Sequence, residues 1–172
     1  MMPSDDQALK QAQQQAYRLL SYRSRTAREL RDRLQHKGFE PRVVDEVLQR
    51  LEDDGYVNDR RLAEDWARYR LQAKPMGRQR LAVELQRRGL ERTLIDEVLR
   101  AVYAEFDEAN LAEQAAKKRL RRLSNPPSPR EYQRLVRYLE GQGFDTPVIK
   151  GVLAALSCSD ALPDLFVDDI IC

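Results

Sequence analysis

The sequence predicts an all-α protein made of three tandem three-helix repeats. Apolar residues recur at helical spacings, and one pattern of apolar residues around a glycine occurs three times. No stretch shows the strict alternation of apolar and polar residues that a half-buried strand would have. We expect three-helix repeats over residues 5–57, 58–106 and 107–157, followed by an acidic C-terminal tail over 158–172.

The repeated pattern is centred on three glycines, 51 and then 54 residues apart: Gly38, Gly89 and Gly143. Two leucines, four residues apart, precede each glycine and give a helix one apolar stripe. The glycine supplies the left-handed residue that ends this helix. An apolar residue and a second amphipathic helix follow. The leucine pairs are Leu30 and Leu34, Leu81 and Leu85, and Leu135 and Leu139.

A further helix is expected before each pair. In the second repeat Asn58 can cap it, and Leu62, Trp66 and Tyr69 follow at helical spacing. We interpret Trp66 and Tyr69 as residues that pack in the core or between repeats, and a stacking platform for nucleic-acid bases is the alternative. In the first and third repeats the corresponding apolar residues are Leu9, Ala12, Ala16, Leu19 and Leu20, and Leu111, Ala115 and Leu120.

Local signals mark several helix boundaries. Thr26 and Glu29 have the spacing of a capping box. Pro41 and Pro147 stand where a first helical turn tolerates proline. Two breaks rich in proline and glycine or serine, at 74–77 and 124–129, separate the first and second helices of the second and third repeats.

The chain lacks the groups that most enzymes use. Its 172 residues are 42% hydrophobic and 34% charged, as in a globular protein, but histidine occurs once, as His36. We interpret His36 as a solvated residue in the last turn of a helix, and one histidine with two distant cysteines cannot form the usual zinc site. Phosphate-binding, dinucleotide-binding and nucleophile-elbow motifs are absent. We therefore expect no catalytic residues, no cofactor and no metal.

The chain also gives no sign of membrane insertion or secretion. No apolar stretch approaches the roughly 18 residues of a membrane span, and the first residues lack the pattern of a signal peptide. The two cysteines, Cys158 and Cys172, are expected to be reduced thiols. These features predict a cytoplasmic protein.

Charge is segregated along the chain although the total is only +2. Between Arg68 and Arg92, eight basic residues oppose two acidic ones, a net charge of +6; we call this the second-repeat stripe. Between Lys117 and Arg137, eight basic residues oppose one acidic residue, a net charge of +7; we call this the third-repeat stripe. A charge run usually marks a solvated face, but two nearly single-signed, arginine-rich runs at equivalent places favour binding to nucleic acid or a nucleoprotein.

Motifs spread over residues 10–156 resemble the RecX family. They are Gly55-Tyr56-Val57-Asn58-Asp59, Leu62-Ala63-x-x-Trp66, Arg70, Gly77, Arg80-Leu81, Glu84-Leu85-x-x-x-Gly89-Leu90 and Ile95-x-x-x-Leu99. The departures from the family pattern are mild: Leu62 replaces an aromatic residue, Leu81 an isoleucine and Arg88 a lysine. The tail has no counterpart in the family pattern.

The resemblance implies a specific function. RecX proteins regulate the bacterial RecA recombinase, and they are elongated, curved arrays of three-helix units. They lie in the helical groove of the filament that RecA forms on single-stranded DNA. They limit its ATP hydrolysis, strand exchange and co-protease activity, and so act in DNA repair and the SOS response, without being enzymes. The expected partners are RecA and single-stranded DNA, with double-stranded DNA as a further candidate, and the chain is expected to be a monomer.

We expect the two stripes to supply the contacts to the filament or its DNA. The residues concerned are Arg70, Arg78, Arg80, Arg87, Arg88, Lys117, Lys118, Arg121, Arg122, Arg130 and Arg134. Two alternatives stay open: a sequence-specific double-stranded DNA-binding protein with recognition helices in the major groove, and an adaptor that binds only protein. The tail is either a flexible end or a segment that docks on a basic face.

Overall fold

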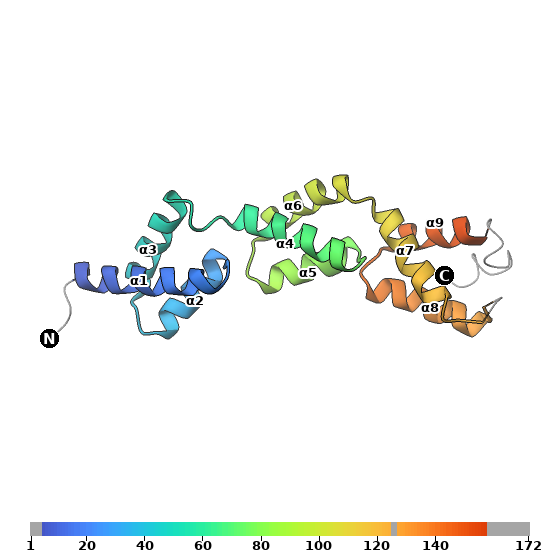
Figure 1. The fold of residues 1–172 in the computed structure, drawn as a ribbon, viewed down its shortest axis with the longest axis horizontal. Helices are drawn as coiled ribbons and strands as arrows, with labels where there is room; N and C mark the ends of the chain where they lie inside the picture. Colours follow the sequence, from blue (N-terminus) through green and yellow to red (C-terminus); the bar gives the residue numbers. More distant parts are fainter. Residues whose placement is uncertain (1–4, 125–126, 158–172) are drawn as a thin grey trace. The chain divides into compact units, whose positions relative to one another are not determined.

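The computed structural model describes residues 5–124 and 127–157, which form nine α-helices and no strand (Figure 1). The expected all-α fold is confirmed. Residues 158–172, with Cys158 and Cys172, lie outside the described residues, so the expectations for the tail stay predictions. The helices are α1 (Asp5–Tyr22), α2 (Ala27–His36), α3 (Pro41–Asp53), α4 (Asp59–Ala73), α5 (Arg78–Arg87), α6 (Arg92–Glu105), α7 (Glu108–Leu120), α8 (Pro129–Gly141) and α9 (Thr146–Ser157).

The helices pack into two compact units. The first consists of Met1–Trp66 and Leu85–Ile95, and the second of Ala67–Glu84 and Asp96–Cys172, as far as these residues are described. The division passes through α4, α5 and α6. Packing therefore joins parts of the middle three helices to the three before them and other parts to the three after them. The boundaries of the three expected repeats stay predictions.

Several of the predicted helix boundaries are confirmed. Thr26 and Glu29 form a complete capping box at the start of α2, and Pro41 is the first residue of α3. The glycines of the repeated pattern have positive φ angles: 89° at Gly38, 83° at Gly89 and 87° at Gly143. An L-residue with a side chain pays a steric cost in this conformation, which explains why glycine recurs there.

Each unit has its own apolar core. In the first, α1, α2 and α3 pack around residues that include Ala12, Leu30, Leu34, Val47 and Leu51, all fully buried. Burying a leucine or valine side chain contributes about 1.5–3 kcal/mol. In the second unit α7, α8 and α9 enclose Ala116, Leu135, Leu139, Phe144, Ile149 and Leu153. The leucines of the repeated pattern are therefore core residues in both units.

The two aromatic residues of α4 differ in burial. Trp66 is half-buried, with the Arg88 guanidinium 4.8 Å from the centre of its ring. Tyr69 is 62% exposed, so the expectation that it belongs to the core is wrong.

Within the described residues, no helix is both long and apolar enough to cross a membrane.

Candidate nucleic-acid interface

Arg78 is held at the start of α5 by the acid that starts α7. Glu108 accepts a hydrogen bond from the Arg78 backbone N–H at 2.9 Å and another from Arg78 Nε at 2.7 Å. The guanidinium also lies over Tyr103, 4.8 Å from the ring centre. The Tyr103 hydroxyl donates to the carbonyl of Met76, and burial raises its pKa. Arg78 is therefore exposed but already paired with a carboxylate of the same unit.

Arg70 and Arg80 are likewise engaged within the second unit. Arg70 forms a two-point ion pair with Glu84, at 2.7 and 2.8 Å, and this hydrogen bonding lowers the pKa of Glu84. Arg80 lies 3.6 Å from Glu84 and donates to Gln142 Oε1 at 3.2 Å and to the carbonyl of Gly141 at 3.4 Å. Both arginines join helices to one another, and neither presents an isolated charge.

Arg88 has a comparable role in the first unit. Its Nε lies 3.4 Å from Glu29, its guanidinium covers Trp66, and its carbonyl accepts from Thr26 Oγ1 at 2.8 Å. The side chain is only 16% exposed. Arg87, the next residue back, is exposed and makes no ion pair with the described residues.

The two units contain the same kind of helix junction. The backbone N–H of Ala27, first residue of α2, donates to Asp59, first residue of α4, at 2.9 Å. In the second unit Arg78, first residue of α5, donates to Glu108, first residue of α7. A carboxylate at a helix N-terminus satisfies an otherwise unpaired N–H group. An acid that opens one set of three helices thus caps the second helix of the preceding set.

The third-repeat stripe has fewer ion pairs than the second-repeat stripe among the described residues. Lys117 pairs with Glu113 at 2.6 Å, and the Arg119 guanidinium lies 5.5 Å from the ring centre of Tyr138. The remaining six cations are exposed and have no ion pair with any described residue. They are Lys118, Arg121, Arg122, Arg130, Arg134 and Arg137.

These six cations come from the last turn of α7, from the turn that follows it and from one face of α8. Arg130, Arg134 and Arg137 are spaced i, i+4 and i+7, which puts them on one side of the helix. The opposite side packs into the core through Leu135 and Leu139. Because α7 and α8 pack against each other, their cations belong to the same helix bundle.

The single acid of the third-repeat stripe is already engaged. Glu131 accepts hydrogen bonds from Ser124 and Ser128, and with Ser128 it forms the capping box of α8. These hydrogen bonds lower its pKa to about 2. Glu131 therefore stays ionised and bound to serine groups, and it forms no ion pair with the stripe's arginines among the described residues.

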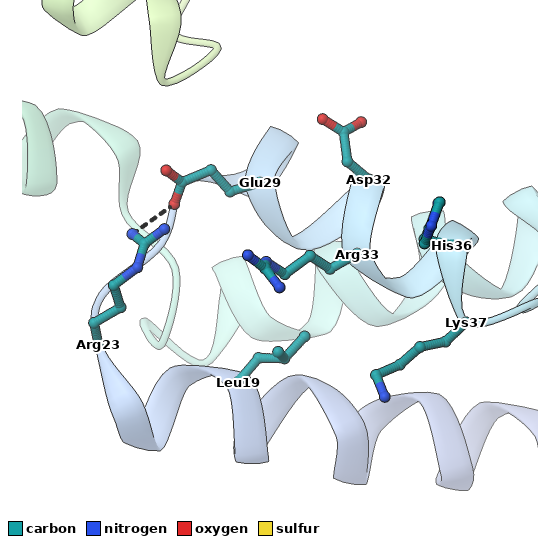
Figure 2. A pocket seen from close by; sticks show the side chains of 7 residues that line it. All are labelled: Leu19, Arg23, Glu29, Asp32, Arg33, His36 and Lys37. Carbon is teal, nitrogen blue, oxygen red and sulfur yellow. Dashed lines mark hydrogen bonds and ion pairs between the residues drawn. The ribbon is translucent and has the colours of Figure 1, made fainter.

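A cavity of about 620 Å³ lies between α1 and α2 in the first unit (Figure 2). Arg23 and Glu29 pair across part of it at 3.0 Å, Arg33 points toward its centre, and Asp32 points away. None of the residues predicted from the stripes lines it. Its mixed charges differ from the single-signed groove that suits a phosphate backbone. The lining residues are Leu19, Arg23, Glu29, Asp32, Arg33, His36 and Lys37.

Beside this cavity is a buried arginine that sequence reasoning missed. Arg25 is 8% exposed, its Nε donates to the carbonyl of Leu19 at 3.1 Å, and its Nη1 has no partner among the described residues. Burial, and then the nearby Arg23 and Arg33, lower its pKa.

His36 is exposed at the end of α2, as expected. Across the described part of the chain, no group of three or more His, Cys, Asp or Glu side chains could hold a metal ion.

Three family models match the chain in order. They describe the first three-helix domain of RecX, over residues 12–51, the second, over 58–99, and the third, over 107–153. The chain belongs to the RecX family. The resemblance inferred from the motifs is thereby confirmed, as is the tandem arrangement of three-helix units.

Similar proteins agree with this assignment to RecX. A "Regulatory protein RecX" of Caldanaerobacter subterraneus subsp. tengcongensis is 32% identical over 144 residues, which is 84% of this chain and 70% of the relative. One from Mycobacterium sp. (strain KMS) is 37% identical, over 80% of this chain and 75% of the relative. The crystal structure of RecX from Lactobacillus salivarius shares the fold, with a TM-score of 0.81 at 20% identity over 88% of this chain and 97% of that one. The relatives are thus named as regulatory proteins.

Proposed function

We propose that this RecX-family chain is a regulator, mainly an inhibitor, of the RecA recombinase. It binds in the groove of the filament of RecA on single-stranded DNA and limits ATP hydrolysis, strand exchange and co-protease activity. It acts by docking and forms no covalent bonds. The proposal is supported by family membership and by relatives that are named as regulatory proteins.

The observation that carries the proposal is the set of exposed cations on α7 and α8 without ion pairs among the described residues. A guanidinium that is paired with a carboxylate of the same chain must give up that ion pair before it binds a phosphate. The six exposed cations have no such ion pair to break among the described residues. Arginine suits this role because its planar fork can donate two hydrogen bonds to one phosphate. We propose that Lys118, Arg121, Arg122, Arg130 and Arg134 make the principal contacts.

The other predicted residues have supporting roles in this proposal. Arg87 is exposed like the cations of α7 and α8, so we assign it to the contact surface. Arg70, Arg78, Arg80 and Arg88 shape that surface through their internal bonds. Lys117 can add a contact because its ion pair with Glu113 is exposed to solvent.

The test is the RecA ATPase on single-stranded DNA, titrated with the chain at two salt concentrations. The test variant carries Arg121→Glu, Arg122→Glu and Arg134→Glu, and the control carries Arg18→Glu, Arg42→Glu and Arg100→Glu. All six arginines are exposed and lack ion pairs with the described residues, so the substituted sites are comparable. Each variant has three Arg→Glu substitutions and therefore changes the net charge by the same amount. We expect inhibition that weakens with salt, because each phosphate contact contributes about −0.7 to the salt slope on a single strand.

The test variant should need a concentration at least about tenfold higher for half-inhibition, the equivalent of roughly 1.4 kcal/mol, and the control less than about twofold. A folded test variant that inhibits as well as the unaltered chain contradicts the docking surface. Equal losses in both variants would attribute the effect to net charge alone. Binding to RecA without any salt dependence would favour the adaptor that binds only protein.

A further inference from the structure

The proposed function leaves one charged segment of the chain unused. Residues 158–172 contain four aspartates, at 160, 164, 168 and 169, and no lysine or arginine. This acidic segment follows directly on α9, which ends at Ser157. The segment lies outside the described residues, but its sequence, its length and its point of attachment are known.

The point of attachment lies close to the exposed cations. Helix α9 packs against both α7 and α8, the two helices that carry them. In Figure 1, α9 ends at the same end of the bundle as the connection between α7 and α8, where Arg121, Arg122 and Arg130 stand in the sequence. The attachment point of the acidic segment and the start of α8 therefore lie at one end of the same bundle.

The acidic segment is also long enough to reach every cation of the stripe. Fifteen residues span up to about 50 Å when extended. Helix α8, with 13 residues, is only about 20 Å long. Attachment at Ser157 also makes binding of the segment to this surface an intramolecular event, for which effective concentrations are in the millimolar range when the linker is short.

We propose that residues 158–172 are an intramolecular competitor of nucleic acid for the third-repeat stripe. The four aspartate carboxylates occupy the guanidinium and ammonium groups that would otherwise bind phosphates. This inference rests on the proposed function, because it names how the same surface is regulated.

The charges on the two sides make the competition reversible. Four carboxylates face six cations, so the surface remains positive when the segment is docked. Exposed ion pairs are individually weak and are screened by salt. A long strand that presents many phosphates can therefore displace the segment, whereas a short or weakly bound strand cannot. The segment thus raises the threshold for binding and does not abolish it.

The test measures binding of a fluorescent oligo-thymidine strand to three proteins at low and moderate salt. They are the full chain, a chain that ends at Ser157, and a full chain with Asp160→Asn, Asp164→Asn, Asp168→Asn and Asp169→Asn. We expect both altered chains to bind about five- to tenfold more tightly at low salt, and the difference to shrink as salt rises. A control with Glu40→Gln, Glu52→Gln, Asp54→Asn and Asp96→Asn makes the same charge change at exposed sites and should bind less than about twofold more tightly.

The outcomes separate this inference from the proposed function. Equal binding by the full and shortened chains overturns the competitor and leaves the proposed function standing. Failure of every protein to bind the strand or to inhibit RecA overturns the proposed function itself. In the Arg121→Glu, Arg122→Glu, Arg134→Glu background, removal of the segment should no longer change binding; a full effect there would place the segment elsewhere. An effect that grows with protein concentration would assign the segment to a second copy and overturn its intramolecular action.

Discussion

The second-repeat and third-repeat stripes carry net charges of +6 and +7, yet the structure uses their side chains differently. In the second-repeat stripe five of the eight cations have carboxylate partners, and Lys74, Arg87 and Arg92 have none among the described residues. In the third-repeat stripe one cation of eight has such a partner, Lys117. Similar charge along the sequence therefore corresponds to different numbers of available cations.

Three of these five cations pair with acids that lie outside the stripe, and the other two, Arg70 and Arg80, share Glu84 within it. Glu105 and Glu108, in the second unit, pair with Arg68 and Arg78. Glu29, in the first unit, pairs with Arg88. The third set of helices has no fourth set after it within the described residues to contribute an opening acid. The comparison teaches that the cations of a basic run stay unpaired only where folding brings them no carboxylates.

The largest expected effect concerns the glycine turn against which Arg80 packs. A Cβ added at Gly143 would lie 2.4 Å from the Arg80 backbone nitrogen, whereas one added at Gly38, which has a similar positive φ, would meet nothing within 4 Å. We expect Gly143→Ala to lower the free energy of unfolding by about 2–5 kcal/mol, and Gly38→Ala by about 1–2 kcal/mol. Chemical denaturation followed by circular dichroism measures both. Equal losses of unfolding free energy would show that the close contact of Gly143 with Arg80 adds nothing to the steric cost of a side chain at positive φ.

A smaller effect is expected from arginine truncation in the two stripes. Arg88→Ala removes the contact with the Trp66 ring and the ion pair with Glu29, and should cost about 1–2 kcal/mol of unfolding free energy. Arg122→Ala removes an exposed side chain without an ion pair among the described residues, and should change stability by less than about 0.5 kcal/mol. Thermal unfolding compares the two. If Arg122→Ala is the more destabilising, the division into internal and available cations is wrong.

The smallest effect concerns the one acid of the third-repeat stripe. The pKa of Glu131 is lowered to about 2 from an ordinary value of 4.5, so its ionised form stabilises the fold above about pH 4.5 and this contribution is lost as the pH falls toward 2. The unaltered chain should therefore melt at a higher temperature than Glu131→Gln at pH 6, and the two should converge near pH 2. A difference in melting temperature that is constant between pH 6 and pH 2 would contradict the assigned role of the carboxylate.

Much of the local structure could be predicted because its causes are short in sequence range. The leucine pairs mark buried helix faces, the glycines end helices, and Thr26 with Glu29 caps α2. The family assignment also followed from motifs confined to short segments. The burial of Tyr69 was predicted wrongly, because helical spacing shows which side of a helix a residue occupies and not whether another element covers that side.

The candidate site was harder to predict. The helix-capping acids Asp59 and Glu108 stand 32 and 30 residues from the N–H groups that they accept from. The only feature of the sequence that could have indicated these caps is the acidic residue that begins the first helix of the second and third repeats. The buried Arg25 gave no signal, since its burial depends on how the connection between α1 and α2 packs.

The sequence by itself determined the helices, their order, the three-helix repeats and the family, since periodicity, caps and glycines act within a few residues of one another. Only the tertiary structure decided which basic residues are available. An ion pair forms between groups that folding brings within about 4 Å, and these groups can be distant in the chain. Most cations of the second-repeat stripe are thus paired with carboxylates, and most cations of the third-repeat stripe are exposed without such partners among the described residues.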